Sequence, residues 1–307
     1  MQIIGWIIFG ILVLYFIIAF IIFLTSSNKK VSKLLKVNDE KFIGDLSPFH
    51  ERMRAGKRWV DKQEKEDLYI HSKDNLKLHG MFIPNKNNKK IMILSHGYGS
   101  TPERDIYSSC SEYYNMGFSL LIIDLRACGE SEGKWFTFGY HEHEDLALWV
   151  KYIHKNYKNS EIVIGGVSLG ATIALMTPNI NKHVDGIIAD SGYVNAYEQV
   201  GYIISYFFHM PKLFMPMVNV YYKWFLHVNL RWVDTVNSLK NIKIPILFIH
   251  GIDDEFVLID NTITNYNSYK GKKEKLFVNY ATHGASYLYD RNAYVETIKK
   301  FLKKHGL

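Results

Sequence analysis

The chain has 307 residues, of which 48% are hydrophobic and 22% are charged, values that fit a globular protein with a sizeable core and exclude disorder throughout. The net charge of +7 is spread along the chain without a nucleic-acid-binding motif, so we expect no nucleic-acid partner. Cys110 and Cys128 form neither a CxxC pair nor a disulfide framework, so the cysteine content does not require an oxidising compartment.

The N-terminus contains an uninterrupted apolar segment. Ile3 to Leu24 carries no charged residue and, as a helix, would span about 33 Å, enough to cross a hydrocarbon core of about 30 Å. A cleaved signal peptide is the alternative. No Lys or Arg precedes the segment, it exceeds the length of a signal-peptide apolar region, and no A-x-A site follows it. We therefore predict a retained transmembrane anchor at residues 1–27.

Basic residues follow this anchor. Lys29, Lys30, Lys33 and Lys36 lie just after it and nothing basic precedes it, so the positive-inside rule predicts a single-pass protein of the cell membrane with a cytoplasmic C-terminal domain. Large domains cross membranes despite such charges, which leaves the opposite orientation open. Residues 28–65 are polar and are interpreted as a juxtamembrane linker with some helix.

From residue 66 onward, short apolar runs alternate with segments of helical length. Asp67–Ser72 and Lys77–Pro84 are predicted to form an antiparallel strand pair around a turn. The later runs are four to six residues long and rich in Ile, Leu or Val, which is typical of strands buried on both faces of a parallel sheet: Ile91–Ser95, Ser119–Asp124, Ile162–Gly165, Gly186–Asp190, Ile246–His250 and Lys275–Val278.

The segments between these runs predict the fold class. Their lengths suit helices, at Glu103–Met116, His143–Tyr157, Leu169–Pro178 and Asn292–His305. Repeated strand–helix units predict an α/β fold, with a mostly parallel central sheet and helices on both of its faces. Functional residues in such sheets lie beyond the carboxyl ends of the strands.

A G-x-S-x-G sequence follows the third of these runs, at Gly166–Gly170. The motif by itself is weak and is also compatible with an ordinary glycine-rich turn. Its position after a buried strand and before a helix favours a sharp turn that exposes the hydroxyl of Ser168 as a nucleophile. The N-terminus of the following helix would favour negative charge that develops there.

The loop after Ile91–Ser95 reads His96-Gly97-Tyr98-Gly99-Ser100. Acyl transfer through a tetrahedral intermediate needs N–H donors directed at its oxyanion. The backbone N–H of Leu169 and that of Tyr98 are predicted to supply them in this topology. His96 is interpreted as a structural residue whose ring holds the loop.

The last two strands are followed by an acidic pair and by a histidine. Asp253 and Asp254 come after Ile246–His250, and either carboxylate is placed to orient a catalytic imidazole. Asp190, after an earlier strand, is a further alternative for that role. His283 follows Lys275–Val278, and an imidazole there would accept and return the serine proton.

The chain order Ser168, Asp254, His283 is that of the α/β-hydrolase triad, and residues 66–305 resemble that superfamily. Within it, the sequence is similar to bacterial dienelactone-hydrolase-like and serine-aminopeptidase-like esterases. Residues 124–133 resemble the family's D-x-R-x-x-G-x-S-x-G stretch, with Cys128 where His is common, and residues 145–149 resemble its D-L-x-x-W helix. The family's H-G-x-x-D-x-x-V spacing implies that Asp254 is the triad acid and that Asp253 caps the turn.

A long insertion follows residue 190. In such hydrolases a helical lid lies here, so residues 66–307 are predicted to form one hydrolase domain with a lid at about 191–241. The insertion is rich in aromatic residues and methionine, which suits an apolar acyl pocket. Packing of the lid helices against one another, and a lid that faces lipid, are the alternatives.

We therefore expect a membrane-anchored serine hydrolase, a carboxylesterase that acts on small or lipid-like acyl esters. His141-Glu142-His143-Glu144 contains metal-ligand types, but residues two apart on a helix do not face each other, so we expect neither a metal nor a cofactor. Two alternatives stay open. One is a peptidase or an acyltransferase with the same triad, and the other is a non-catalytic membrane-anchored binding protein.

Overall fold

The computed structural model describes residues 2–34, 44–86, 89–179 and 182–307. Within these residues the chain forms an eight-stranded sheet in the order β1-β2-β4-β3-β5-β6-β7-β8. The pairs β1–β2 and β2–β4 are antiparallel, and every other neighbouring pair is parallel. The strands are β1 (Glu66–His71), β2 (Lys77–Ile83), β3 (Lys90–Ser95), β4 (Ser119–Ile123), β5 (Glu161–Val167), β6 (Gly186–Asp190), β7 (Ile246–Gly251) and β8 (Lys273–Val278).

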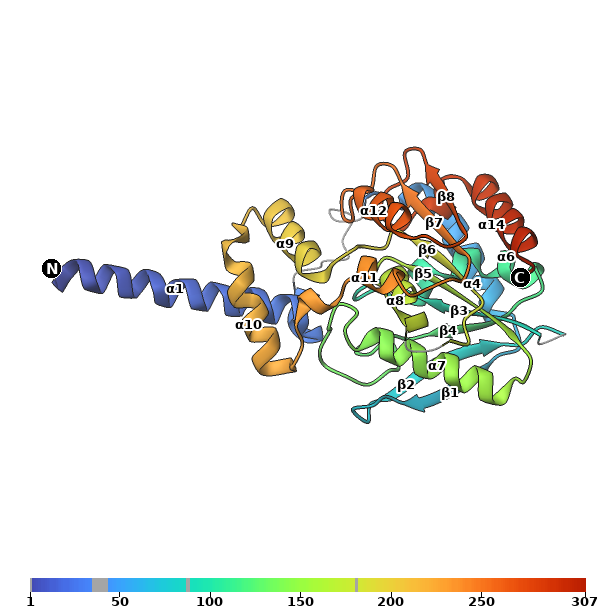
Figure 1. The fold of residues 1–307 in the computed structure, drawn as a ribbon, viewed down its shortest axis with the longest axis horizontal. Coiled ribbons are helices and arrows are strands. Elements are labelled where there is room, and N and C mark those ends of the chain that lie inside the picture. The colour runs from blue at the N-terminus through green and yellow to red at the C-terminus, as the bar shows by residue number, and fades with distance from the viewer. Residues whose placement is uncertain (1, 35–43, 87–88, 180–181) are drawn as a thin grey trace.

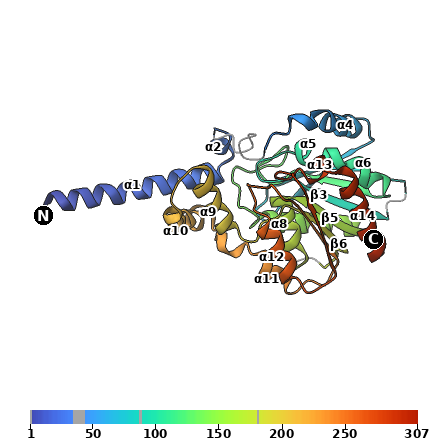
Figure 2. The same cartoon turned by 90° about the horizontal axis from the view of Figure 1, so that it is seen from above.

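Helices cover both faces of this sheet. Figure 2 shows α4, α5, α6 and α13 on one side of the strands and α8, α11 and α12 on the other. The helices around the sheet are α4 (His50–Asp61), α5 (Pro102–Asp105), α6 (Tyr107–Asn115), α7 (Glu142–Asn156), α8 (Leu169–Met176), α11 (Thr235–Leu239), α12 (Asp260–Ser268), α13 (Ser286–Tyr289) and α14 (Arg291–His305). The mostly parallel α/β sheet predicted from the apolar runs is therefore confirmed.

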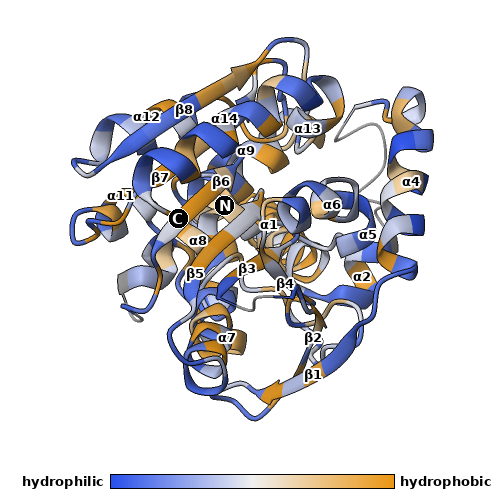
Figure 3. Cartoon of the chain, turned by 90° about the vertical axis from the view of Figure 1, so that its right-hand side faces the viewer, coloured by the Kyte–Doolittle hydropathy of each residue, from blue (hydrophilic) through white to orange (hydrophobic). Residues whose placement is uncertain are grey.

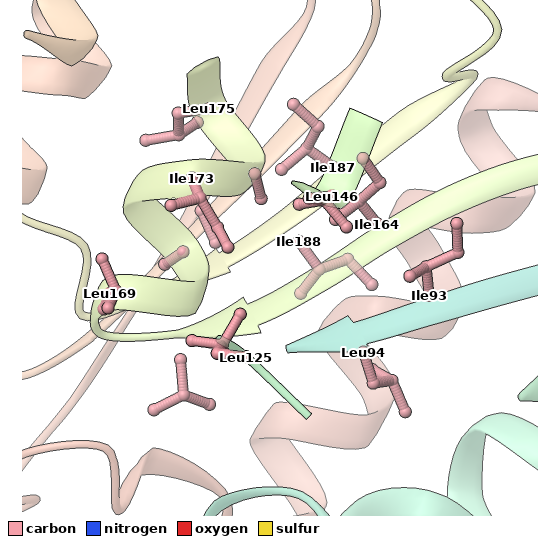
Figure 4. Close-up of a cluster of buried hydrophobic side chains, with 14 of the residues drawn as sticks. Ile93, Leu94, Leu125, Leu146, Ile164, Leu169, Ile173, Leu175, Ile187 and Ile188 are labelled. Carbon is pink, nitrogen blue, oxygen red and sulfur yellow. The ribbon is translucent and has the colours of Figure 1, made fainter. Parts of the chain in front are cut away.

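The core lies between the parallel strands and these helices. Its central strands β3, β4, β5, β6 and β7 are buried almost throughout, as their runs of Ile, Leu and Val require. Ile173 of α8 and Ile164 and Ile187 of the sheet belong to one cluster of buried hydrophobic side chains (Figure 4). Hydrophobic residues concentrate in the central strands, whereas the surrounding loops and outer helix faces are more polar (Figure 3). This packing holds the carboxyl ends of the strands at one rim.

The N-terminal helix α1 (Gln2–Ser27) projects from this body (Figure 1). The segment between β6 and β7 is helical, as expected for the lid, and contains α9 (Ala196–Phe207), η3 (Lys212–Phe214), α10 (Met215–Leu226) and η4 (Leu230–Trp232) before α11. In Figures 1 and 2, α9 and α10 lie beside the C-terminal half of α1. Ala19, Ile22 and Phe23 are buried there.

The segment expected to be a linker is largely folded. It contains α2 (Lys29–Leu34), η1 (Ser47–Phe49) and α4, while the part at residues 35–43 lies outside the described residues. Helix α4 packs against α6 so closely that a Cβ on Gly56 would lie 2.6 Å from the Tyr107 carbonyl oxygen. Val60 of α4 is fully buried. Residues 44–65 are therefore part of the body of the fold, which polar composition alone did not indicate.

Candidate active site

Ser168 stands at the turn between β5 and α8, in a conformation unusual for a residue with a side chain. Its backbone has φ 58° and ψ −118°, in the left-handed half of the φ range. The flanking glycines permit this turn. A Cβ on Gly166 would lie 2.3 Å from the Gly170 carbonyl carbon, and one on Gly170 would lie 2.2 Å from the Ser95 carbonyl oxygen. The expected strand-to-helix elbow is thus present.

Two side chains from other loops meet Ser168. His283, in the loop after β8, places Nε2 2.9 Å from the Ser168 Oγ. Its Nδ1 lies 2.7 Å from Oδ2 of Asp254, in the loop after β7. All three side chains are buried at the carboxyl ends of their strands. The structure therefore brings together the serine, histidine and aspartate proposed from the sequence.

The Asp254 carboxylate is fixed by its own loop. Its Oδ1 accepts hydrogen bonds from the N–H groups of Phe256, at 3.0 Å, and Val257, at 2.8 Å. Burial acts to raise the pKa of Asp254, but interactions with His283 and His250 outweigh it and hold that pKa well below its usual range. An ionised carboxylate only accepts, so Nδ1 of His283 carries a proton and Nε2 is free to accept the serine proton.

The two other candidate acids are placed differently. Asp253 is exposed, and its backbone N–H donates to the Ala281 carbonyl oxygen. Asp190 is buried and accepts hydrogen bonds from the hydroxyls of Ser191 and Ser286. Burial raises the pKa of Asp190. Of the three carboxylates considered from the sequence, Asp254 is the one in contact with His283.

The loop after β3 passes close to Ser168. A Cβ on Gly97 would lie 3.3 Å from the Ser168 Cβ, and the Gly97 N–H donates to Asp105 at 2.8 Å. Because the Gly97 amide is occupied, the next amide along this loop, that of Tyr98, is the oxyanion-hole candidate. Leu169 begins α8, so its N–H has no partner within the helix.

His96 is buried and holds the same loop. Its Nε2 accepts the Leu125 N–H at 3.2 Å, so Nδ1 carries the proton that is donated to the Gly97 carbonyl oxygen at 2.8 Å. Burial lowers the pKa of His96. These contacts fit the structural role expected for it.

The stretch from His141 to Glu144 is used to organise the loop before α7. Glu142 is buried and accepts from the Thr137 N–H, the Thr137 hydroxyl and the Gly139 N–H. The Nδ1 of His143 lies 2.8 Å from the Gly139 carbonyl oxygen. Both side chains therefore hold the loop before α7 in its conformation.

Residues 90–228 match the family described as alpha/beta hydrolase fold. The chain has the α/β-hydrolase fold. Residues 218–305 also match a family described as PhoPQ-activated pathogenicity-related protein. The narrower esterase subgroup expected from the sequence stays a prediction.

Solved structures agree with this assignment. The chain is 26% identical to the esterase Pf2001 of Pyrococcus furiosus, with a TM-score of 0.64 over 79% of this chain and 93% of that one. The hydrolase GrgF of a Penicillium species has the same fold, with a TM-score of 0.65 at 18% identity, over 79% of this chain and 99% of that one.

Two curated relatives carry names that give no activity. The protein YqkD of Bacillus subtilis is 26% identical over 247 residues, which are 79% of this chain and 80% of YqkD. An uncharacterised membrane protein of Saccharomyces cerevisiae is 23% identical over 248 residues, which are 78% of this chain and 80% of that protein.

His250 is a site residue that the sequence reasoning did not single out. Its Nε2 lies 2.8 Å from the Val257 carbonyl oxygen and 3.3 Å from Oδ2 of Asp254, and its Nδ1 lies 2.7 Å from the Thr262 hydroxyl. Asp254 thus lies between two imidazoles. The available signal was the spacing of four residues between His250 and Asp254, which places both around one strand end.

The contact between His250 and Asp254 makes stability depend on pH. Burial acts to lower the pKa of His250, but the hydrogen bond and the charge of Asp254 outweigh it and raise that pKa above its ordinary value of 6.5. The stabilisation from protonated His250 is therefore complete below about pH 6.5 and is lost as the pH rises through the raised pKa. We expect the unfolding free energy to fall less between about pH 6 and about pH 9 in His250→Gln than in wild type, measured by urea denaturation in detergent. Equal slopes would contradict this.

Proposed function

We propose that this α/β-hydrolase is a membrane-anchored serine hydrolase that cleaves acyl esters through an acyl-enzyme. The observation that carries the proposal is the hydrogen-bonded line from Asp254 through His283 to Ser168. A serine that contacts an imidazole, itself oriented by a buried carboxylate, has the arrangement that activates a hydroxyl as a nucleophile. The 26% identity to the Pyrococcus furiosus esterase supports ester bonds as the target.

In the first half of the reaction, Ser168 Oγ attacks the ester carbonyl carbon while His283 Nε2 takes the hydroxyl proton. The bond between the acyl carbon and the alcohol oxygen then breaks, and His283 gives its proton to the departing alcohol. In the second half, water attacks the acyl-enzyme with His283 again as the base, and the carboxylic acid leaves. Asp254 holds the imidazole tautomer and stabilises the imidazolium formed in each half.

The oxyanion of each tetrahedral intermediate needs donors that are already in place. We assign the N–H groups of Leu169 and Tyr98 to this role, because the first begins α8 and the second follows Gly97 in the loop beside Ser168. Ser168 lines a small pocket together with Tyr98, Phe138, Tyr193, Gln199, Ile203, Phe256 and Val257. This largely apolar lining suits the acyl side of an ester.

The membrane assignment rests on α1, which is the one helix of the described residues that is long and apolar enough to cross a bilayer. A cleaved signal peptide meets the same criterion, but α1 buries Ala19, Ile22 and Phe23 against the rest of the protein, which favours a retained anchor. A yeast relative is named as a membrane protein. We propose residues 1–27 as the anchor and, from the lysines that follow, a cytoplasmic hydrolase domain.

A fluorophosphonate probe tests the nucleophile directly. We expect the full-length protein in detergent to be modified once, with peptide mass spectrometry placing the adduct on Ser168, and to hydrolyse p-nitrophenyl acetate. Heat-unfolded protein is the control, because labelling requires the assembled triad. A folded protein that takes no adduct and releases no nitrophenol would favour the non-catalytic alternative.

A further inference from the structure

An apolar cavity of about 170 Å³ lies between the membrane helix and the lid. Its walls come mainly from α1, through Ile21, Ile22 and Thr25, and from α9, through Val200 and Ile204. The polar groups nearby are already satisfied. The Thr25 hydroxyl donates to the Ile22 carbonyl oxygen, and the Ser26 hydroxyl bonds within α1 and to Tyr222. An apolar cavity without free polar partners holds water poorly and accepts hydrocarbon.

The cavity adjoins the pocket that contains Ser168. Three residues, Tyr98, Phe138 and Ile203, line both spaces. The Tyr98 ring stacks on Phe138 with centroids 4.7 Å apart, and its hydroxyl donates to the Ser26 carbonyl oxygen at 2.7 Å. The loop assigned to the oxyanion hole therefore touches the base of the membrane helix, and the two spaces share a wall.

The length of α1 places the lid at the membrane. Residues 2–14 of α1 are exposed and span about 20 Å, which is less than a hydrocarbon core of about 30 Å. From Tyr15 onward α1 is in contact with the lid. The Tyr15 ring stacks on Phe214 at 5.2 Å, its hydroxyl donates to the Leu213 carbonyl oxygen, and the Tyr221 hydroxyl donates to the Phe16 carbonyl oxygen. If α1 spans the bilayer, this part of the lid must lie within the nearer leaflet.

The lid surface suits that position. Leu213, Trp224 and Phe225 are 68%, 68% and 57% exposed, a set of large apolar side chains that water would not favour. Lys212 and Lys223 lie in the same segment, and their long apolar stems allow the ammonium groups to reach lipid headgroups.

We propose that this cavity, the α1–α9 cavity, binds the long acyl chain of a lipid ester that enters from the nearer leaflet. The inference rests on the proposed function and adds its substrate class. The alkyl chain lies against α1 and α9, and the ester carbonyl reaches Ser168 past Tyr98 and Phe138. The acyl carbon–oxygen bond of the lipid breaks there, the alcohol leaves with the proton from His283, and water later releases the fatty acid.

If the cavity binds the acyl chain, a bulky side chain that fills it should lower kcat/KM for long-chain esters more than for acetate. We expect Thr25→Phe in full-length protein in mixed micelles to lower the kcat/KM ratio of p-nitrophenyl dodecanoate to acetate by about tenfold, since each buried methylene contributes roughly a fourfold factor. Met210→Ala enlarges the cavity and should raise the ratio of tetradecanoate to dodecanoate. Ile17→Phe adds the same ring to the exposed face of α1, outside the cavity, and should keep both ratios.

The outcomes separate the two proposals. If wild type takes the fluorophosphonate and hydrolyses acetate, but both cavity variants keep the wild-type ratios, the α1–α9 cavity is not the acyl site while the serine hydrolase stands. If wild type shows neither labelling nor acetate hydrolysis, the proposed function itself fails. If Thr25→Phe is not labelled because it does not fold, the Met210→Ala ratio decides. A ratio changed by Ile17→Phe as much as by Thr25→Phe would also overturn the cavity.

Discussion

Ser168→Ala is expected to lower kcat for p-nitrophenyl acetate by about 10⁶-fold and to abolish fluorophosphonate labelling, because no hydroxyl remains to form the acyl-enzyme. His283→Ala should cost about as much, since the hydroxyl is a poor nucleophile without a base 2.9 Å away. The double variant should be no slower than either single one, because the two residues act as a unit. The kcat of each variant is compared in steady-state assays with that of wild type, whose concentration of active sites is determined by titration.

Ser268→Ala is the matched control for that loss. Ser268 ends α12 and its hydroxyl bonds to the Thr264 carbonyl oxygen of the same helix, so its removal should leave kcat within about twofold of wild type. Circular dichroism and thermal unfolding check that all variants are folded. Residual hydrolysis by Ser168→Ala at a tenth of the wild-type rate would mean that another group attacks the ester.

The position of Ser168 was predictable because its determinants are local. A buried strand, two glycines and a helix follow one another within a few residues, and the same glycines prove to be sites where a Cβ would meet the backbone. The location of the residues that follow β7 and β8 was predictable for a similar reason. Parallel strands place their carboxyl ends together, so strand order predicted that the Asp253–Asp254 pair and His283 lie at one rim, whereas the choice of Asp254 depended on the family's spacing.

The packing of α1 against the helices between β6 and β7 was not predictable in the same way. It depends on contacts such as Tyr15 with Phe214 and Phe23 with Tyr222, which join residues about 200 positions apart. Apolar composition marked α1 as a membrane helix and the insertion as apolar. It gave no indication that the two pack together, or that Tyr98 would link their junction to the loop beside Ser168.

His250 illustrates a different limit. In the sequence it ended an apolar run, and a strand-end histidine is easily taken as structural. Its importance depends on the turn at residues 251–257, which directs the Asp254 carboxylate back towards the His250 ring. Side-chain direction within such a turn is set by its backbone conformation, which residue types alone do not determine.

Asp254→Asn is expected to lower kcat by about 10⁴-fold with little change in fold. The reason lies in the hydrogen bonds of the carboxylate. Oδ1 accepts from the Phe256 and Val257 N–H groups, so the amide oxygen of the new side chain must take that place. The amide nitrogen then faces His283 Nδ1 and donates to it. The imidazole proton is forced onto Nε2, where it blocks transfer from Ser168.

The neighbouring position provides the control for this argument. Asp253→Asn removes the same charge one residue away, but from an exposed side chain, and kcat should stay within about twofold of wild type. The two substitutions change the net charge equally. A difference in kcat between them therefore reports the contact of Asp254 with His283 rather than a long-range electrostatic effect of the lost charge. A large loss in Asp253→Asn, with Asp254→Asn near wild type, would contradict the triad, since the carboxylate 2.7 Å from Nδ1 would then have no part in holding the tautomer.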